Sequence, residues 1–439
     1  MKRLIFAIPF FVYANVASAE TLREAVDITL KTNPDILAAV HERRAVSEEI
    51  EQARAGYFPT LDLGLGTGYE RTSNPATRNN PNNGDSVGYN RNEASLNARQ
   101  MLFDGMQTQN EVSRQKARTN SRAFTVSSVA ENTALEAVDA YLNVLQQQKI
   151  VELAQDNLEA HLRTHDQIML RAERGVGRRA DVDQSLGRLA LAETNLMAEQ
   201  SNLRDTQTNY LRVVGVMPTS LSEPESPASL IPATVEEAIA QAVSNHPTLK
   251  SAKADVASAH YQHDTALAPF FPRIDFEVGV RQDNNIDAVR GSDRDFQAML
   301  RLRYNLYNGG RDLARREETA ALINQAAEIR NNTYRQVEES TRLSWNALQT
   351  VRNQMAYFET YAAAAEKTRD AYQQQFSLGQ RTLLDLLDSE NELFRSRISL
   401  TEAQYDEKYA MYRILNSMGL LLEGLEVQAP EATETVAIN

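Results

Sequence analysis

Two long stretches without proline or glycine constrain the fold of this chain most strongly. Neither residue type occurs between Gly105 and about Arg174, nor between Gly310 and about Ser377. A helix over either stretch would be roughly 100 Å long at about 1.5 Å per residue. Apolar residues recur in the first stretch at steps of three and four, along two stripes. One stripe is Ala137, Tyr141, Val144, Val151, Leu158, Leu162 and Met169; the other is Leu135, Val138, Leu142 and Leu145. A helix with two apolar seams packs against neighbours on two sides, as in the wall of a cylinder.

The sequence also repeats itself. Residues 21–40, TLREAVDITLKTNPDILAAV, match residues 234–253, TVEEAIAQAVSNHPTLKSAK, and the register holds as far as Pro59 and Pro272. The match resumes where LFDG, ending at Gly105, corresponds to LYNG, ending at Gly309. A constant register on both sides of one local length change indicates a duplicated unit with a tolerant loop.

We therefore predict two structural repeats with the same order of elements. The first repeat spans 20–233 and ends in a proline-rich linker, and the second spans 234–424. Residues 425–439 are predicted to form a flexible acidic tail. The predicted elements are a β-hairpin at about 59–103 with long helices at about 105–174 and 180–214, and a second hairpin at about 272–307 with long helices at about 310–377 and 382–418.

The two hairpins alternate between apolar and polar residues. Ile274, Phe276 and Val278 alternate with Asp275 and Glu277. This is typical of outer-membrane barrel strands, although a half-buried sheet in a soluble domain gives a similar pattern. Aromatic residues at the bases of the strands favour the membrane, because aromatic girdles lie at its interfaces. The predicted aromatic girdle is Tyr57, Phe58, Phe103, Phe270, Phe271 and Tyr307.

Four strands are too few for a closed barrel, since the smallest membrane barrels use about eight. An open sheet edge in lipid would leave backbone groups unpaired, so the chain is expected to oligomerise. We predict an α+β membrane protein that forms an oligomer with a shared β-barrel and long helices in the wall of a cylinder, and a trimer would supply 12 strands.

The first 19 residues are predicted to be a secretory signal peptide. Lys2 and Arg3 precede the apolar run from Leu4 to Val16, and Ala17-Ser18-Ala19 is a cleavage site that would leave Glu20 as the first mature residue. The alternative is an uncleaved anchor helix, but the run is shorter than the roughly 20 residues that a membrane span needs.

Composition excludes several classes of function. The chain has no cysteine, which excludes disulfides, zinc–thiolate sites, cysteine nucleophiles and a lipid-modified cysteine. Its formal charge of -13 argues against a nucleic-acid partner. His161 and His165 lie one helical turn apart and could bind a metal, but such a pair is more often a polar stretch of exposed helix. With no phosphate-binding loop or nucleophile–histidine arrangement, we expect no enzyme activity, no cofactor and no metal.

Several segments together resemble one family, the TolC-like outer-membrane efflux proteins. The segments are ARAGYFPTLDL, QMLFDGM and FSLGQRTLLDLLDSENEL, set within the doubled architecture. The resemblance covers nearly the whole mature chain. It implies a homotrimer in outer-membrane lipid, in which three chains share a 12-stranded outer-membrane β-barrel and a long α-helical barrel that extends into the periplasm. It also implies a periplasmic adaptor (membrane fusion) protein and an inner-membrane transporter, of ABC type, as partners that supply the energy.

The resemblance further implies a periplasmic entrance gate. Its residues correspond here to Asp181, Arg381, Asp385 and Asp388, and a tyrosine of the family is replaced by Phe376. The implied adaptor-docking tips carry Gly175, Gly177 and Gly379.

The spacing and charge of the gate residues also support an interpretation that does not depend on the resemblance. Asp385 and Asp388 lie three residues apart on one helical face, so a trimer would hold a ring of carboxylates that selects cations. A solvated helix start after Gly379 would equally favour aspartates. We expect Arg381 to pair with Asp181 in the closed state.

Residues 155–196 are most similar to type I secretion channels that export large adhesins or agglutination proteins. The expected function is therefore a passive exit duct for such a protein. One alternative is the outer-membrane component of a multidrug efflux pump. Another, a soluble periplasmic coiled-coil scaffold, would explain the helices but not the hairpins.

Overall fold

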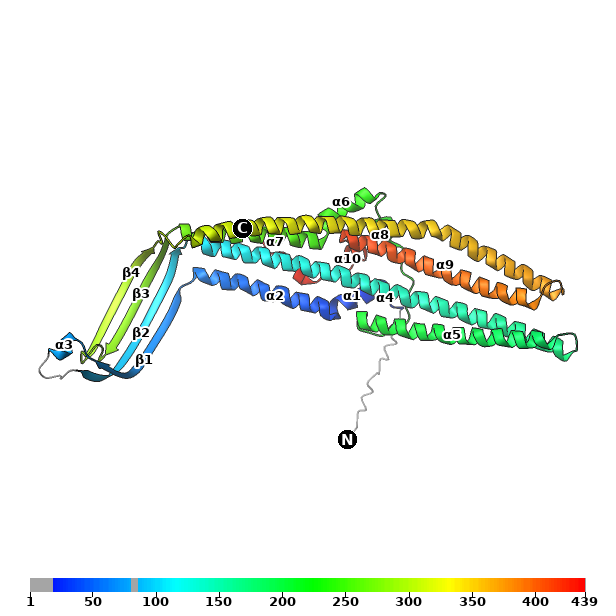
Figure 1. Ribbon diagram of the computed structural model, residues 1–439, viewed down its shortest axis with the longest axis horizontal. Coiled ribbons are helices and arrows are strands. Elements are labelled where there is room, and N and C mark those ends of the chain that lie inside the picture. Colours follow the sequence, from blue (N-terminus) through cyan, green and yellow to red (C-terminus); the bar gives the residue numbers. More distant parts are fainter. Residues whose placement is uncertain (1–18, 80–85, 439) are drawn as a thin grey trace, which may run out of the picture. The chain divides into compact units, whose positions relative to one another are not determined.

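The computed structural model describes residues 19–79 and 86–438 (Figure 1). The predicted signal peptide, apart from Ala19, lies outside the described residues. The chain forms two compact units, each assembled from segments that are distant in sequence. Unit 1 comprises residues up to 37, 128–246 and 337–430; unit 2 comprises 38–127, 247–336 and the residues from 431 onward.

Unit 2 contains a single antiparallel sheet within the described part of the chain. Its strands are adjacent in the order β1 (Thr60–Thr72), β2 (Val87–Phe103), β3 (Arg273–Asn284) and β4 (Ser292–Arg303), as Figure 1 shows. A short helix, α3 (Pro75–Arg78), lies between β1 and β2. The register aligns one apolar row across all four strands, from Leu63 through Leu96 and Val280 to Phe296. The two predicted hairpins are therefore neighbours in one sheet.

The two faces of this sheet differ sharply in chemistry. One face carries arginines and carboxylates, and the other carries large apolar side chains that are exposed in the single chain. Leu65 is 74% exposed and Phe296 is 72% exposed. A hydrocarbon surface of this kind is unfavourable in water and suits lipid. The other exposed apolar side chains on this face include Leu61, Leu63, Leu300 and Leu302.

Helices α2 (Pro34–Arg54) and α7 (Pro247–Leu267) lead to the sheet in unit 2 through the 3-10 turns η1 (Ala55–Tyr57) and η3 (Ala268–Phe270). The two repeats approach closely at Gly105. A Cβ added there would lie 2.6 Å from the carbonyl oxygen of Ala268, and the residue has a φ of +70°. Only glycine fits this position, because both the space and the left-handed backbone exclude a side chain.

The tail after residue 425 ends with contacts in unit 2. Beyond the short turn η4 (Glu431–Thr433), the side chain of Asn120 accepts from the N–H of Val436 at 2.6 Å and donates to its carbonyl at 2.9 Å. The segment predicted to be a flexible tail thus includes a fixed point of attachment.

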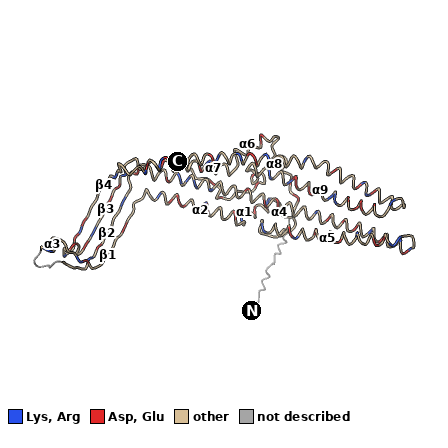
Figure 2. Tube along the Cα trace, viewed as in Figure 1, with Lys and Arg blue, Asp and Glu red and all other residues tan. Residues whose placement is uncertain are grey.

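Corresponding helices of the two repeats have equal lengths. Helices α4 (Gln107–Glu173) and α8 (Arg311–Ser377) each run unbroken for 67 residues, roughly 100 Å. The shorter pairs also match: α1 (Leu22–Thr32) with α6 (Val235–Asn245), α2 with α7, and α5 (Arg179–Val214) with α9 (Leu383–Met418). Among the described residues, no helix combines the length and the hydropathy needed to cross a bilayer. Figure 2 shows charges of both signs spread along these helices, as expected for solvated surfaces.

Unit 1 is built on α5, α9 and the C-terminal parts of α4 and α8. The turn η2 (Pro227–Leu230) and the short helix α10 (Leu421–Gly424) pack against α9. Tyr141 and Tyr210 are fully buried, with ring centroids 6.4 Å apart. Their hydroxyls donate to the carbonyl oxygen of Glu20 at 2.7 Å and to its carboxylate at 2.8 Å, respectively. The start of the described chain is thereby fixed to the core of unit 1.

Candidate functional site

Helices α4 and α8 both end, in unit 1, with the same backbone motif. Gly175, after α4, and Gly379, after α8, have φ values of +76° and +73°. In each turn, the residue after the glycine donates its N–H to a carbonyl five residues earlier, Val176 to Arg171 at 3.0 Å and Gln380 to Gln375 at 2.9 Å. These are Schellman motifs, which satisfy the last carbonyls of a helix and favour glycine at the left-handed position.

The third predicted tip glycine, Gly177, is required for a different reason. A Cβ at this position would lie 2.8 Å from the backbone nitrogen of Ala172. The turn between α4 and α5 therefore folds back on the end of α4 so closely that no side chain fits.

Asp385 takes part in the cap at the start of α9. The backbone N–H of Asp385 donates to Oγ1 of Thr382 at 3.3 Å, and the Thr382 hydroxyl donates to Oδ2 of Asp385 at 2.9 Å. The hydroxyl bond is the main cause that lowers the pKa of Asp385. A negative side chain in the first turn is also favoured by the helix dipole. Asp385 therefore has the role at the helix start that the sequence analysis gave as the alternative to a carboxylate ring.

Arg381 is held by residues of its own turn. Its guanidinium lies 4.0 Å from the ring centroid of Tyr372, and its Nε donates to the side chain of Gln375 at 3.0 Å. Its Nη1 lies 3.6 Å from the carboxylate of Asp385, four residues further along. Within one chain, the partner of Arg381 is thus Asp385 and not the predicted Asp181, because the i,i+4 spacing places the nearer carboxylate beside it. A pair between chains stays a prediction.

Asp388 forms an ion pair that joins the two repeats between α5 and α9. Nη2 of Arg188, on α5, donates to Oδ1 of Asp388, on α9, at 2.6 Å. The sequence analysis missed Arg188 and Tyr372. A signal for the arginine was available, because it lies seven residues after Asp181, two turns along α5 on the same side of the helix.

The two aspartates of the predicted ring therefore each have a cation beside them. With Tyr361 and Tyr372 they line an open groove of about 440 Å³. A ring built from these aspartates would therefore be less negative than its carboxylate count implies.

Phe376 lies in an apolar cluster below these charges. It is buried with Ile168, Leu383, Leu386 and Leu387, and Val182 packs against the group. The guanidinium of Arg171 lies over its ring at 5.1 Å from the centroid. The phenyl ring joins α8 to α4 and α9 through apolar packing and this contact with Arg171, and it needs no hydrogen-bond partner.

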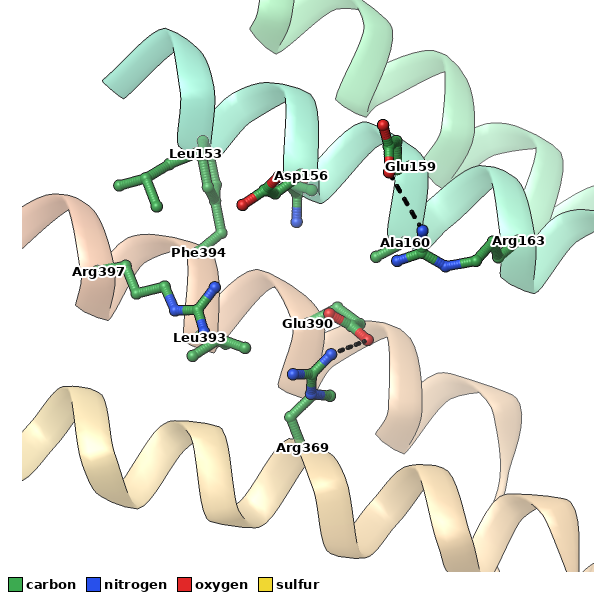
Figure 3. Close-up of a pocket in the computed structure, with 11 residues that line it drawn as sticks. Leu153, Asp156, Glu159, Ala160, Arg163, Arg369, Glu390, Leu393, Phe394 and Arg397 are labelled. Atoms are coloured by element: carbon green, nitrogen blue, oxygen red, sulfur yellow. Dashed lines mark hydrogen bonds and ion pairs between the residues drawn. The ribbon is translucent and has the colours of Figure 1, made fainter. Parts of the chain in front are cut away.

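A charged cavity lies further along the same helices (Figure 3). It has a volume of about 200 Å³ and is lined by α4, α8 and α9. Nη1 of Arg369 donates at 3.4 Å to Glu390, which is buried and has a raised pKa because burial disfavours its charged form. A buried ion pair between α8 and α9 favours one register of the two helices, since a shift would leave a charge unpaired.

The histidine pair is not on an exposed helix face, which corrects the expected surface position. His161 is only 2% exposed, and its pKa is lowered by burial. His165 contacts the hydroxyl of Ser185 at 2.9 Å through Nδ1. In the described residues, no group of three or more metal-binding side chains occurs.

The six residues of the predicted aromatic girdle all belong to unit 2. Each lies at a strand end that continues into a helix. Phe58 is 67% exposed and Tyr307 is 84% exposed, whereas Phe103 is half-buried. The others, Tyr57, Phe270 and Phe271, are also exposed.

Comparison with known proteins identifies the family. The family described as "Outer membrane efflux protein" matches residues 25–216 and 238–420, one block in each repeat. The chain is 28% identical over 407 residues to the outer membrane efflux protein BepC of Brucella suis, covering 92% of this chain and 86% of BepC. It is 24% identical to the proteases secretion protein PrtF of Dickeya chrysanthemi, covering 96% and 93% of the two chains.

A solved structure has the same fold. The outer membrane protein VceC of Vibrio cholerae superposes with a TM-score of 0.72 at 16% identity, covering 93% of this chain and 97% of VceC. The predicted fold class is confirmed, with four antiparallel strands per chain beside long helices. Family channels are passive ducts and not enzymes. From a family match over both repeats, we conclude that this chain belongs to the outer membrane efflux protein family and is a channel protein of the outer membrane that extends into the periplasm.

Proposed function

We propose that three copies of this chain form the exit duct of a type I secretion system for a large adhesin-like protein. The observation that carries the trimer is the sheet itself. It has one apolar exposed face, and its outer strands β1 and β4 have a strand on one side only within the described residues. Lipid does not tolerate unpaired backbone groups, so pairing β4 with β1 of the next copy closes the sheet. Three copies then give a 12-stranded barrel.

The turns of unit 1 are proposed to form the periplasmic entrance. Arg188 with Asp388 holds α5 to α9 in the closed state, Arg381 with Asp385 lies at the start of α9, and Phe376 packs against both arms. Asp181, in the first turn of α5, is proposed to face an arginine of a neighbouring copy. The tips at Gly175, Gly177 and Gly379 are proposed to dock a periplasmic adaptor that connects to an inner-membrane ABC transporter.

The cargo is proposed from two supports. The stretch 155–196 resembles channels that export adhesins, and the relative PrtF is named for the secretion of proteases. The second candidate function is drug efflux, which is favoured by the name of BepC, an outer membrane efflux protein.

A gene deletion separates these two functions. If the duct serves adhesin export, deletion abolishes the surface display of a large secreted protein, and cells fail to aggregate, with unchanged growth on dyes and detergents. Unchanged aggregation together with increased sensitivity to dyes, detergents or antibiotics would instead assign the chain to drug efflux. Expression of the intact gene from a plasmid is the control, because it must restore the lost property in either case.

A further inference from the structure

The polar face of the sheet carries a group of arginines that the export function does not explain. Arg99 lies on β2, Arg273 on β3, and Arg301 and Arg303 on β4, all near the strand ends that continue into helices. The strand register places the four on one face, because Arg99 pairs with Glu277, Arg301 with Asp275, and Arg303 with Arg273. We call these four residues the arginine collar.

Two carboxylates lie between the arginines. Asp275 is 3.1 Å from Arg273 and 2.7 Å from Arg303. Glu277 is 2.8 Å from Arg301 and 3.4 Å from Arg99, and it also pairs with Arg303. In the described part of the chain, no other carboxylate lies within ion-pair distance of the collar. The four arginines and these two carboxylates together therefore carry two more positive than negative charges in each chain.

The charges are also layered. The side chains of the four arginines are 41–55% exposed, whereas Glu277 is 19% exposed and Asp275 is fully buried. The short carboxylates lie against the sheet, and the long guanidinium groups cover them. A solute that approaches this face therefore meets arginine donors first, and a guanidinium bonded to a carboxylate on one edge keeps further N–H donors free.

We infer that the collar is a binding site for multivalent anions, such as solutes with several phosphate or sulfate groups, inside the duct. This inference rests on the proposed trimer, in which the apolar face meets lipid and the polar face lines the lumen. Three collars then form one ring of twelve guanidinium groups. Planar guanidinium forks bind phosphate oxygens through paired hydrogen bonds, and a ring in a narrow lumen focuses its field on the solute.

The test uses inorganic tripolyphosphate and the purified channel in planar bilayers, with the anion added on the loop side of the barrel. The wild-type channel should show a reversible, voltage-dependent block that weakens as salt is raised. The double variant Arg99→Gln/Arg301→Gln should need roughly tenfold more tripolyphosphate for the same block, because it removes the excess charge of each collar. Both substitutions leave intact the ion pairs of Asp275 with Arg273 and Arg303.

Two controls make the result specific. Arg294→Gln removes an arginine from β4 on the opposite face of the sheet and should leave the block unchanged. Arg99→Lys/Arg301→Lys keeps the charge and should retain most of the block. If the double glutamine variant does not assemble, Arg99→Gln alone, which breaks only the longest of these ion pairs, should still weaken the block.

The outcomes distinguish the collar from the duct. A wild-type channel that conducts but is blocked equally in the glutamine variants would overturn the collar and leave the export function intact. A wild-type protein that forms no channel at all would overturn the proposed duct.

Discussion

Arg188 on α5 and Asp388 on α9 are joined by a 2.6 Å hydrogen bond between charged groups, and this bond connects the first repeat to the second. The other pair at the tip, Arg381 with Asp385, lies within a single repeat. Of these two ion pairs, the Arg188–Asp388 pair is the one that resists separation of the two helix–turn–helix arms. It is therefore the first contact to test as a latch of the entrance.

We predict that Arg188→Ala raises the single-channel conductance in planar bilayers. An exposed pair contributes about 0–1 kcal/mol, and three copies acting together give up to roughly a hundredfold in open probability. Lys149→Ala is the matched control, because Lys149 pairs with Glu152 on its own helix, α4. Equal conductance in both variants would refute the latch.

The predicted role of Arg381 has a different test. Because its carboxylate partner in the chain is Asp385, Arg381→Ser alters the charge of the groove without parting the repeats. We expect this change to increase cation selectivity, measured from the reversal potential in a salt gradient, with little change in conductance. A large rise in conductance would favour a pair between chains, with Asp181 of a neighbouring copy.

Thr382→Ala should loosen the α8–α9 turn. The hydroxyl caps α9 and bonds to Asp385, and the loss of such a cap costs about 1 kcal/mol. Hydrogen exchange in the first turn of α9 should therefore become faster by several-fold. Thr368→Ala, which removes a hydroxyl bonded within α8, is the control and should leave that turn unchanged.

Unit 1 should become more stable as the pH falls, through Glu131. This carboxylate accepts the N–H groups of Leu421 and Leu422, but burial raises its pKa to about 7. The folded state therefore binds a proton more tightly than the unfolded chain, whose pKa is about 4.5. The resulting stabilisation is complete below pH 4.5 and is lost as the pH rises through about 7.

The size of this effect is on the order of 3 kcal/mol, from about 1.4 kcal/mol per pH unit. Thermal unfolding of the wild type at pH 5.5 and pH 8 should differ more than that of Glu131→Gln, whose side chain is neutral at both values. A variant with the same pH dependence as the wild type would show that other groups cause it.

Leu300→Arg should impair assembly into the membrane, whereas Gln297→Arg should not. Leu300 lies on the apolar face and Gln297 on the polar face of the same strand. An arginine facing lipid costs about 2 kcal/mol or more in each copy near the centre of a bilayer. The yield of trimer extracted from outer membranes with mild detergent measures the difference. Similar yields would reverse the assignment of the two faces.

The fold could be predicted from the sequence largely because the chain contains two repeats with the same order of elements. Proline at the start of α2 and α7 and glycine at the ends of α4 and α8 act through local backbone geometry, which the sequence reveals directly. The two faces of the hairpins follow in the same way from alternation of residue types.

The contacts at the tip were harder to predict because they depend on which helices meet. The sequence placed Asp385 and Asp388 on one face, but it did not show that Arg188 comes from α5 to meet one of them. The burial of His161 was also missed, because a single polar residue on a long helix carries no signal of the neighbour that covers it.

The strand order β1-β2-β3-β4 has a consequence for the amount of channel that a cell makes. A folded single chain would carry a bare strand at each side, which invites pairing with any other exposed edge. If three such chains must meet, the formation of channels rises more steeply than in proportion to the supply of chains. Halving expression should then remove more than half of the channels, and surplus chains should be degraded or aggregate before they reach partners.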